Sequence, residues 1–216
     1  DAMHNLRPAV LVNIGGVANL TCVSAADGTG LIGFDIGPGN ALLDDFMMSR
    51  FAVDCDRDGG LAATGSADQT ILARWMQHPY FQQTWPKSLD RQDFAGLLTT
   101  AEFRRLAAAD AADAAATLTC FTAQTIAHAI GKLPVTPRSV FVAGGGRRNG
   151  TMMQYLAAIL SMPVITDPGD GFDADMLEAE LMAFLAARCH YRLPTSFPGT
   201  TGCRQPVSGG QIARAR

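Results

Sequence analysis

The stretch Gly33-Phe-Asp-Ile-Gly-Pro-Gly-Asn40 decides the fold, because the pattern of the chain changes there from strand to helix. Before it ends, three apolar runs are separated by glycine-containing turns, at residues 8–14, 17–24 and 31–36. After it, apolar side chains recur at helical spacing, at Leu42, Leu43, Phe46 and Met47. Strands joined by short turns run antiparallel, so the pattern predicts three antiparallel strands followed by a helix.

The rest of the chain first becomes mostly helical, over residues 52–131, and then alternates between strand and helix. We predict strands at 138–143 and 163–166 and helices at 150–160 and 173–190. Strands joined by crossover helices run parallel. The sequence therefore predicts an α/β fold, a ribonuclease-H-like lobe with a mixed five-stranded sheet and a helical insert. From Pro194 onward the composition predicts extended chain or loop.

The composition is that of an ordinary globular protein, with 48% hydrophobic and 17% charged residues in a chain of 216. The formal net charge of −3 argues against a nucleic-acid or anionic membrane surface. No apolar run approaches the roughly 20 residues that span a bilayer, and the first residues lack a signal peptide's apolar core. The five cysteines are scattered without a C-x-x-C pair, which argues against disulfides or zinc and favours a reducing cytoplasm.

Three glycine-bearing loops each follow a predicted strand, at residues 13–19, 35–40 and 144–149. Glycine lets the backbone come close to a ligand, and N–H groups beside a helix N-terminus bind phosphate. Strand ends converge on one edge of a sheet, so three such loops favour a binding edge, although the first alone reads equally well as a tight turn. The chain has no G-x-x-x-x-G-K-[ST] motif, and Asn149 breaks the G-x-G-x-x-G pattern of a dinucleotide-binding dehydrogenase.

Two carboxylates are candidates for chemistry. Asp35 ends an apolar strand directly before Gly37, where a carboxylate serves as general base or magnesium partner, or else as a simple turn former. Glu178 lies near a helix start, where the helix dipole alone explains it. The acidic run from Asp54 to Asp58 begins like a calcium loop, but its twelfth position is Gly65, so we interpret it as a solvated loop.

Six motifs, taken in order and spacing, resemble the anhydro-N-acetylmuramic acid kinase family of the actin/Hsp70/hexokinase superfamily. They are Asn13–Thr21, Gly33–Asn40, Asp58-Gly59, Pro86–Ser88 with Arg91 and Phe94, Gly144–Gly146 with Asn149, and Glu178-Ala179 with Leu185-Ala186. The resemblance covers nearly the whole chain, and the Gly33–Asn40 motif is its most specific part.

The resemblance implies an ATP-dependent sugar kinase with an actin-like ATPase fold, Mg²⁺ as cofactor and an amino sugar as substrate. Water would open the 1,6-anhydro bond while ATP phosphorylates the 6-oxygen. Asp35 would activate the water, and Glu178 would position substrate or magnesium. The other implied contacts are Asn13, Gly15 and Gly16 to phosphate, Gly144, Gly145, Gly146 and Asn149 to adenosine, and Gly37, Pro38, Gly39 and Asn40 to substrate.

The sequence also departs from the family pattern. Ile36 replaces a common threonine, Leu89-Asp90 replaces Thr-Gly, and Leu181-Met182-Ala183 replaces Ala-Phe-Ala. The family's first lobe carries a Gly-Thr-Ser-x-Asp-Gly phosphate loop that this sequence lacks. We therefore expect residues 1–216 to be a C-terminal lobe, inactive or a poor kinase without an N-terminal lobe as partner; a non-catalytic lobe that binds nucleotide or a partner is the alternative. The family also implies a homodimer.

Overall fold

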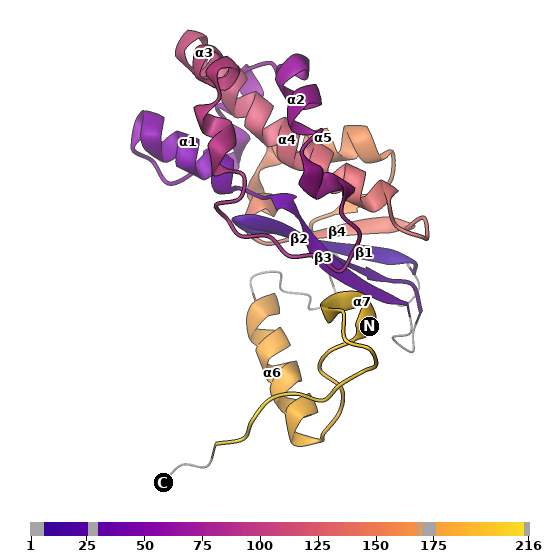
Figure 1. Cartoon of the computed structure of the whole chain (residues 1–216). Helices are drawn as coiled ribbons and strands as arrows, with labels where there is room; N and C mark the ends of the chain where they lie inside the picture. Colours follow the sequence, from indigo (N-terminus) through magenta and orange to yellow (C-terminus); the bar gives the residue numbers. More distant parts are fainter. Residues whose placement is uncertain (1–6, 26–29, 168, 170–175, 214–216) are drawn as a thin grey trace.

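The computed structural model describes residues 7–25, 30–167, 169 and 176–213, and its centre is one five-stranded sheet (Figure 1). The strands are β1 (Ala9–Ile14), β2 (Val17–Val23), β3 (Leu31–Pro38), β4 (Ser139–Ala143) and β5 (Val164–Ile165), in the spatial order β3-β2-β1-β4-β5. β2 is antiparallel to both neighbours, whereas β1, β4 and β5 are parallel. The predicted mixed sheet of a ribonuclease-H-like lobe is confirmed.

Alternating side chains give the sheet one apolar face. Residues of this face pack against α4 and α5 in one buried cluster that includes Val10, Val12, Ile14, Leu20, Phe34, Ile36, Val140 and Val142. Burying a side chain of this size contributes about 1.5–3 kcal/mol, so this face holds the lobe together. The residues between them, among them Asn13, Asn19 and Asp35, point to the opposite face.

Helices are gathered in two groups. Figure 1 shows five on one side of the sheet: α1 (Ala41–Phe51), α2 (Gln69–Trp75), α3 (Ala101–Ala109), α4 (Ala111–Gly131) and α5 (Gly150–Leu160). The other side holds α6 (Leu177–His190) and the short α7 (Pro198–Thr201). In the part of the chain that the structure describes, every helix is too short or too polar to span a lipid bilayer.

The stretch 52–131 forms a helical layer with its own aromatic core. Fully buried rings from separate short elements pack together there: Phe81, Phe94, Phe103 and Phe121, with Trp75 beside them. This core joins the sheet through α4, whose Ala123 and Ile126 belong to the buried cluster of the sheet. The insert is thereby packed against the sheet through α4.

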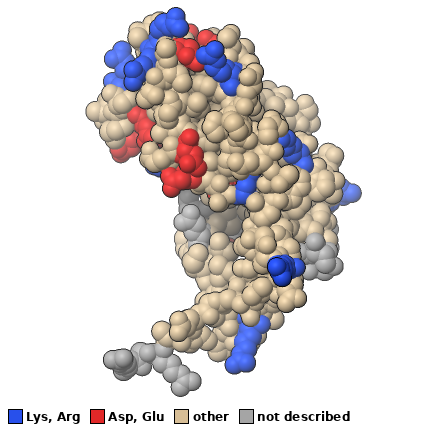
Figure 2. Space-filling model, in the orientation of Figure 1, with Lys and Arg blue, Asp and Glu red and all other residues tan. Residues whose placement is uncertain are grey.

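The C-terminal elements differ from the prediction in detail. The helix predicted at 173–190 is present as α6 from Leu177, and its Leu181 and Phe184 side chains are 49% and 57% exposed. Residues 173–175 lie outside the described part. The predicted loop from Pro194 contains α7 and one bridge between Ser196 and Val207. Figure 2 shows acidic and basic side chains on the helical layer, whereas the charged side chains visible in the part around α6 and α7 are basic.

Candidate functional site

The first two glycine loops are bonded to each other at the ends of β1 and β3. The amide of Gly39 donates to the carbonyl of Gly16 at 2.9 Å, and the amide of Asn40 donates to the carbonyl of Gly15 at 2.8 Å. A side chain at position 39 would overlap the Gly15 carbonyl oxygen, so the close approach requires glycine. The two loops therefore form one rigid unit.

The third loop closes against the same unit. Gly144 has φ of +76°, and a Cβ on Gly146 would overlap the side chain of Ile14. Asn40 adds a link, because its amide nitrogen donates to the carbonyl of Ile14 at 3.4 Å. The parallel strands β1, β3 and β4 thus bring all three loops to their shared carboxyl end. We call residues 13–19, 35–41 and 143–149 the glycine-loop edge.

A cavity of about 330 Å³ opens at the glycine-loop edge. Its lining comes from the third loop, the start of α1 and the acidic loop before residue 59: Asn40, Leu43, Asp44, Cys55, Asp56, Arg57, Asp58, Gly145, Gly146, Arg148 and Asn149. The side-chain oxygen of Asn149 accepts the amide of Met152 at 2.9 Å and so caps α5. Of the residues predicted to contact adenosine, Gly145, Gly146 and Asn149 therefore share one cavity with the start of α1, whereas Gly144 lies outside its lining.

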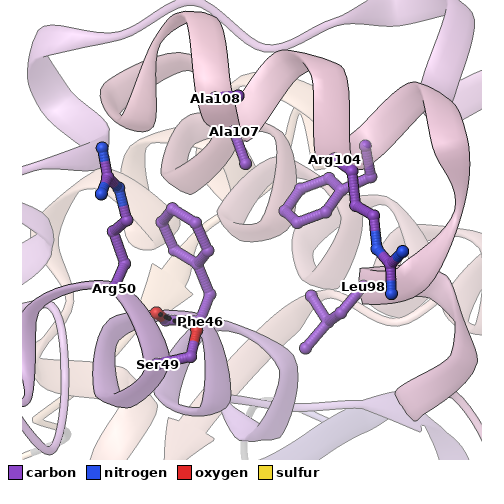
Figure 3. Close-up of a pocket in the computed structure, with 8 residues that line it drawn as sticks. Phe46, Ser49, Arg50, Leu98, Arg104, Ala107 and Ala108 are labelled. Atoms are coloured by element: carbon purple, nitrogen blue, oxygen red, sulfur yellow. Dashed lines mark hydrogen bonds between the residues drawn. The ribbon is translucent and has the colours of Figure 1, made fainter.

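A second cavity, of about 400 Å³, lies away from the glycine loops (Figure 3). It lies between the C-terminal part of α1 and α3, with Phe46 and Phe103 in its wall and Arg50 and Arg104 at its sides. None of the residues predicted from sequence for catalysis or binding lines it. The sequence predictions therefore point to the cavity at the glycine loops and not to this one.

Asp35 lies in a polar row that crosses the sheet. Asn13 on β1 pairs with Asn19 on β2, and Asn19 pairs with Asp35 on β3. Because neighbours in register point to the same face, these three side chains lie on the face opposite α4 and α5. The row begins in the first glycine loop and ends at the predicted base.

The insert holds Asp35 through three hydrogen bonds. Its amide donates to the carbonyl of Lys87 at 3.0 Å, and its Oδ2 accepts the amide of Leu89 at 2.8 Å. The Tyr80 hydroxyl donates to the Asp35 carbonyl at 2.7 Å. Among the described residues nothing donates to Oδ1, so one carboxylate oxygen remains available. Leu89 contributes only its backbone, so the departure from threonine leaves this contact intact.

Lys87, which is partly buried, and Tyr80, which is buried, pack against each other beside Asp35. The Lys87 ammonium donates to the Tyr80 carbonyl at 2.9 Å and lies 4.1 Å from the centre of its ring. Burial, together with Lys132, lowers the pKa of Lys87 to about 8. Burial and then the charge of Asp35 raise the pKa of Tyr80, so its hydroxyl stays protonated and donates. The sequence motif contained Lys87, but neither Tyr80 nor Leu89 was predicted as a site residue.

The segment 37–40 is already occupied by internal contacts. Gly37 lies beneath Phe81 and Thr125, and the Thr122 hydroxyl donates to the Gly39 carbonyl at 2.8 Å. Any substrate contact of this segment therefore has to use groups other than these, and its role stays a prediction. The side chain of Glu178 lies outside the described part, so its role stays a prediction too. Within the described residues no group of three or more His, Cys, Asp or Glu side chains is arranged to hold a metal ion.

Fold and site together define a class: a ribonuclease-H-like α/β lobe with a glycine-lined cavity and a held carboxylate at one sheet edge. A family model described as anhydro-N-acetylmuramic acid kinase matches residues 2–215. The chain belongs to the anhydro-N-acetylmuramic acid kinase family, and the resemblance of the six motifs is confirmed.

Relatives in three bacteria illustrate the match, each named anhydro-N-acetylmuramic acid kinase. The protein of Rhodopseudomonas palustris strain HaA2 is 47% identical over 96% of this chain and 54% of its own length. That of Bradyrhizobium diazoefficiens is 47% identical over 99% and 56%. That of Mesorhizobium japonicum is 43% identical over 94% and 52%. The chain spans about half the length of the curated relatives it matches.

The comparison with solved structures gives a partial match. The activator of the 2-hydroxyisocaproyl-CoA dehydratase from Clostridium difficile, with bound ADPNP, is 14% identical with a TM-score of 0.49. The match covers 76% of this chain and 56% of that chain.

Proposed function

We propose that the chain is the nucleotide-side lobe of an ATP-dependent kinase of anhydro-N-acetylmuramic acid. Water adds to the anomeric carbon, the bond from that carbon to the 6-oxygen breaks, and the 6-oxygen takes the γ-phosphoryl group. The products are N-acetylmuramic acid 6-phosphate and ADP. The observation that carries the proposal is the meeting of three glycine loops and a held carboxylate at one sheet edge in a member of this family.

Asp35 is the general base of this proposal. Its Oδ2 is held by the Leu89 amide, and Oδ1 takes the proton of the attacking water. A positioned base of this kind contributes about 10²–10⁴ in rate. Three contacts from the insert fix its backbone and one oxygen, so the carboxylate needs little reorganisation during the reaction.

The glycine-loop edge is the nucleotide site of the same proposal. Phosphates lie toward Asn13, Gly15 and Gly16, and the nucleoside lies in the cavity beside Gly145 and Gly146. Mg²⁺ arrives with ATP and neutralises phosphate charge; because it keeps waters and phosphate oxygens as ligands, the protein supplies few of its own. The carboxylates that we expect near this ion are Asp35 and Glu178.

The part of the relatives that this chain does not span is the second lobe of the proposed enzyme. With it, the chain acts on a cell-wall sugar in the bacterial cytoplasm, and the homodimer is part of the same expectation. Sedimentation of the reconstituted protein tests the dimer.

Two measurements test the function. Isothermal titration of the chain with ADP tests the nucleotide site, and ADP release with anhydro-N-acetylmuramic acid, after the second lobe of a relative is supplied, tests the reaction. Asp35→Asn should lower turnover by about 10²–10⁴-fold, because the water loses its base. Asp54→Asn, an exposed carboxylate outside the cavity lining, is the control and should turn over normally.

A non-catalytic binding lobe is the second candidate, because Asp35 is not among the residues that line the glycine-loop cavity. Binding of ADP without turnover in the presence of the second lobe would select it. Unchanged turnover in Asp35→Asn would remove Asp35 from the mechanism while leaving a kinase.

A further inference from the structure

One carboxylate of the cavity has no assigned task. Asp44 lies in the first turn of α1, half-buried, and lines the cavity together with Gly145 and Gly146. Among the described residues no N–H or O–H group donates to its carboxylate. Its neighbour Asp45 takes the guanidinium of Arg91 at 2.6 Å, and the cations that line the cavity itself are Arg57 and Arg148. A half-buried carboxylate that lines a cavity and receives no donor from the protein can accept a hydrogen bond from a ligand that enters the cavity.

The other carboxylates of the cavity are different. Asp56 is buried, and its two oxygens accept the amides of Leu61 at 2.8 Å and Ala62 at 3.0 Å. Asp58 is exposed, in a turn with φ of +58°. Asp44 is therefore the carboxylate of this cavity that is both partly buried and free to accept.

The charge of Asp44 also limits which part of a nucleotide can lie against it. Two unit negative charges 4 Å apart repel by about 4 kcal/mol at a surface-like effective dielectric constant of about 20. Arg57 and Arg148 of the same lining offset part of this repulsion, but direct contact of a phosphate with Asp44 remains unfavourable. Gly15 and Gly16, the predicted phosphate residues, are outside the lining of this cavity. The nucleoside end of the ligand remains, and its ribose hydroxyl groups are hydrogen-bond donors.

We propose that Asp44 accepts a hydrogen bond from a ribose hydroxyl and makes this lobe selective for ribonucleotides over deoxyribonucleotides. The inference rests on the proposed function, whose nucleotide site it makes specific. A cavity of about 330 Å³ is of the size that holds a nucleoside. A hydroxyl bonded to a carboxylate is a charge-assisted hydrogen bond, the kind whose loss a binding measurement resolves.

Titration of Asp44 supports the assignment. Burial raises its pKa to about 6, Arg91 lowers it in part, and Asp45 and Asp54 raise it. The carboxylate accepts hydrogen bonds better than the neutral acid, so ADP affinity should rise with pH through about 6 and level off above it.

Isothermal titration of the chain with ADP, 2′-deoxy-ADP, 3′-deoxy-ADP and IDP, at a pH of about 8 where Asp44 is ionised, tests the proposal. We expect ADP to bind about 10-fold more tightly than at least one deoxy analogue, as for one lost charge-assisted hydrogen bond. Asp44→Ala should bind ADP and that analogue equally. Asp54→Asn should keep the full preference.

The outcomes distinguish an error in the role of Asp44 from an error in the nucleotide site itself. Binding of ADP without discrimination by the unchanged chain, or discrimination that persists in Asp44→Ala, overturns the inference alone. A preference for ADP over IDP that depends on Asp44, with no effect of the ribose hydroxyls, assigns the carboxylate to the base and overturns it as well. Failure of the unchanged chain to bind any nucleotide overturns the proposed function and this inference together.

Discussion

The glycine-loop edge and the C-terminal segment, residues 176–213, differ in how far their side chains are buried and their backbones bonded to the rest of the lobe. At the edge, loops from three strands approach closely and the first two bond through backbone groups, and apolar side chains beside them, Ile14, Ile36 and Leu43, are buried. The C-terminal segment instead leaves large apolar side chains in solvent: Met176, Leu181, Met182, Phe184, Tyr191, Leu193, Val207 and Ile212. Four other large apolar side chains of the described residues are similarly exposed, so the uncovered surface is concentrated in this segment.

The segment is nevertheless organised. The guanidinium of Arg188 lies 5.2 Å from the ring of Phe184 and 5.8 Å from that of Phe197. Thr200 of α7 lies directly against Gly33 of β3. The segment therefore packs on itself and contacts the sheet at α7. The glycine-loop edge is instead stabilised by backbone contacts between its loops. Substitutions in the two regions should differ accordingly.

The largest effect is expected where backbones meet. Gly39→Ala places a methyl group onto the Gly15 carbonyl oxygen and should lower the free energy of unfolding by about 3 kcal/mol or more. Chemical denaturation measures this loss, and ADP titration should show weakened binding because the two loops separate.

Gly131→Ala is the matched control, since a Cβ there has no neighbour within 4 Å. It should be neutral or slightly stabilising. Equal stability of the two variants would mean that the loops are not in contact as described.

A smaller loss is expected where the insert holds Asp35. Tyr80→Phe removes the hydroxyl that donates to the Asp35 carbonyl and should cost about 1–2 kcal/mol. Tyr191→Phe, in the C-terminal segment and 71% exposed, should leave stability unchanged. Denaturation curves of both variants decide this, and a similar loss in both would contradict the comparison.

Asp44→Asn should stabilise the chain. A pKa raised from 3.8 to about 6 means that the folded state binds the proton more tightly, so the native carboxylate destabilises the fold as pH rises through this window. After a discount for solvent screening, the variant should gain about 1 kcal/mol near neutral pH.

The gain of Asp44→Asn should shrink as pH falls through about 6 and vanish below 3.8. Thermal melts across this range measure it, with Asp54→Asn as control. A gain that grows toward acid would contradict the assigned direction.

The smallest effect is expected on the exposed face of α6. Leu181→Lys and Met182→Lys should each change stability by no more than about 0.5 kcal/mol, because these side chains are 49% and 61% exposed. Met152→Lys, at a fully buried position of α5, should instead unfold the chain. Unfolding of both α6 variants would show that the segment is covered in solution.

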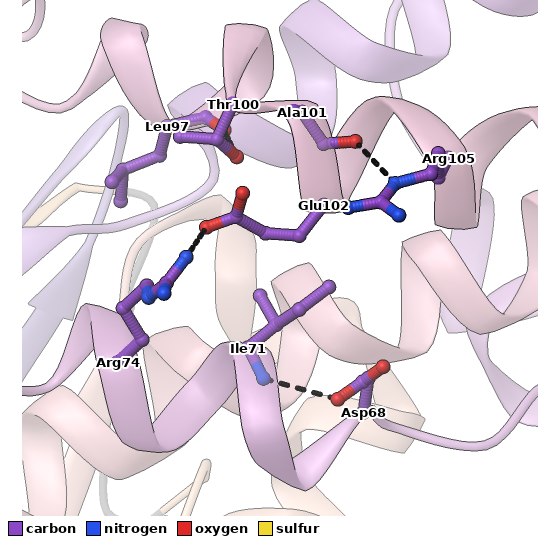
Figure 4. Close-up of polar contacts among 8 residues, drawn as sticks. All are labelled: Asp68, Ile71, Arg74, Leu97, Thr100, Ala101, Glu102 and Arg105. Atoms are coloured by element: carbon purple, nitrogen blue, oxygen red, sulfur yellow. Dashed lines mark hydrogen bonds and ion pairs between the residues drawn. The ribbon is translucent and has the colours of Figure 1, made fainter.

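The boundary between α3 and α4 in the insert could not be predicted from local sequence. The alanine-rich stretch 107–116 is good helix sequence throughout, but Asp110 adopts an extended backbone and caps α4 by accepting the amides of Ala112 and Asp113. The separate α3 that results is joined to α2 by an ion pair of 2.6 Å between Arg74 and Glu102 (Figure 4). An aspartate among good helix formers can continue or cap a helix, and only packing of the insert decides which.

The sequence by itself determined the three antiparallel strands at the start of the chain and the glycine loops, and it marked Asp35 as a candidate for catalysis. Alternation, turn chemistry and backbone freedom are local properties, so they can be read without the fold. Tertiary structure decided which donors and acceptors meet. Tyr80 and Leu89 reach Asp35 from 45 and 54 residues away, and they do so through a hydroxyl and a backbone amide that carry no motif. Asp44 stands out only in the folded chain, because folding places its carboxylate in the cavity and directs the nearby donors to Asp45 and Asp56 instead.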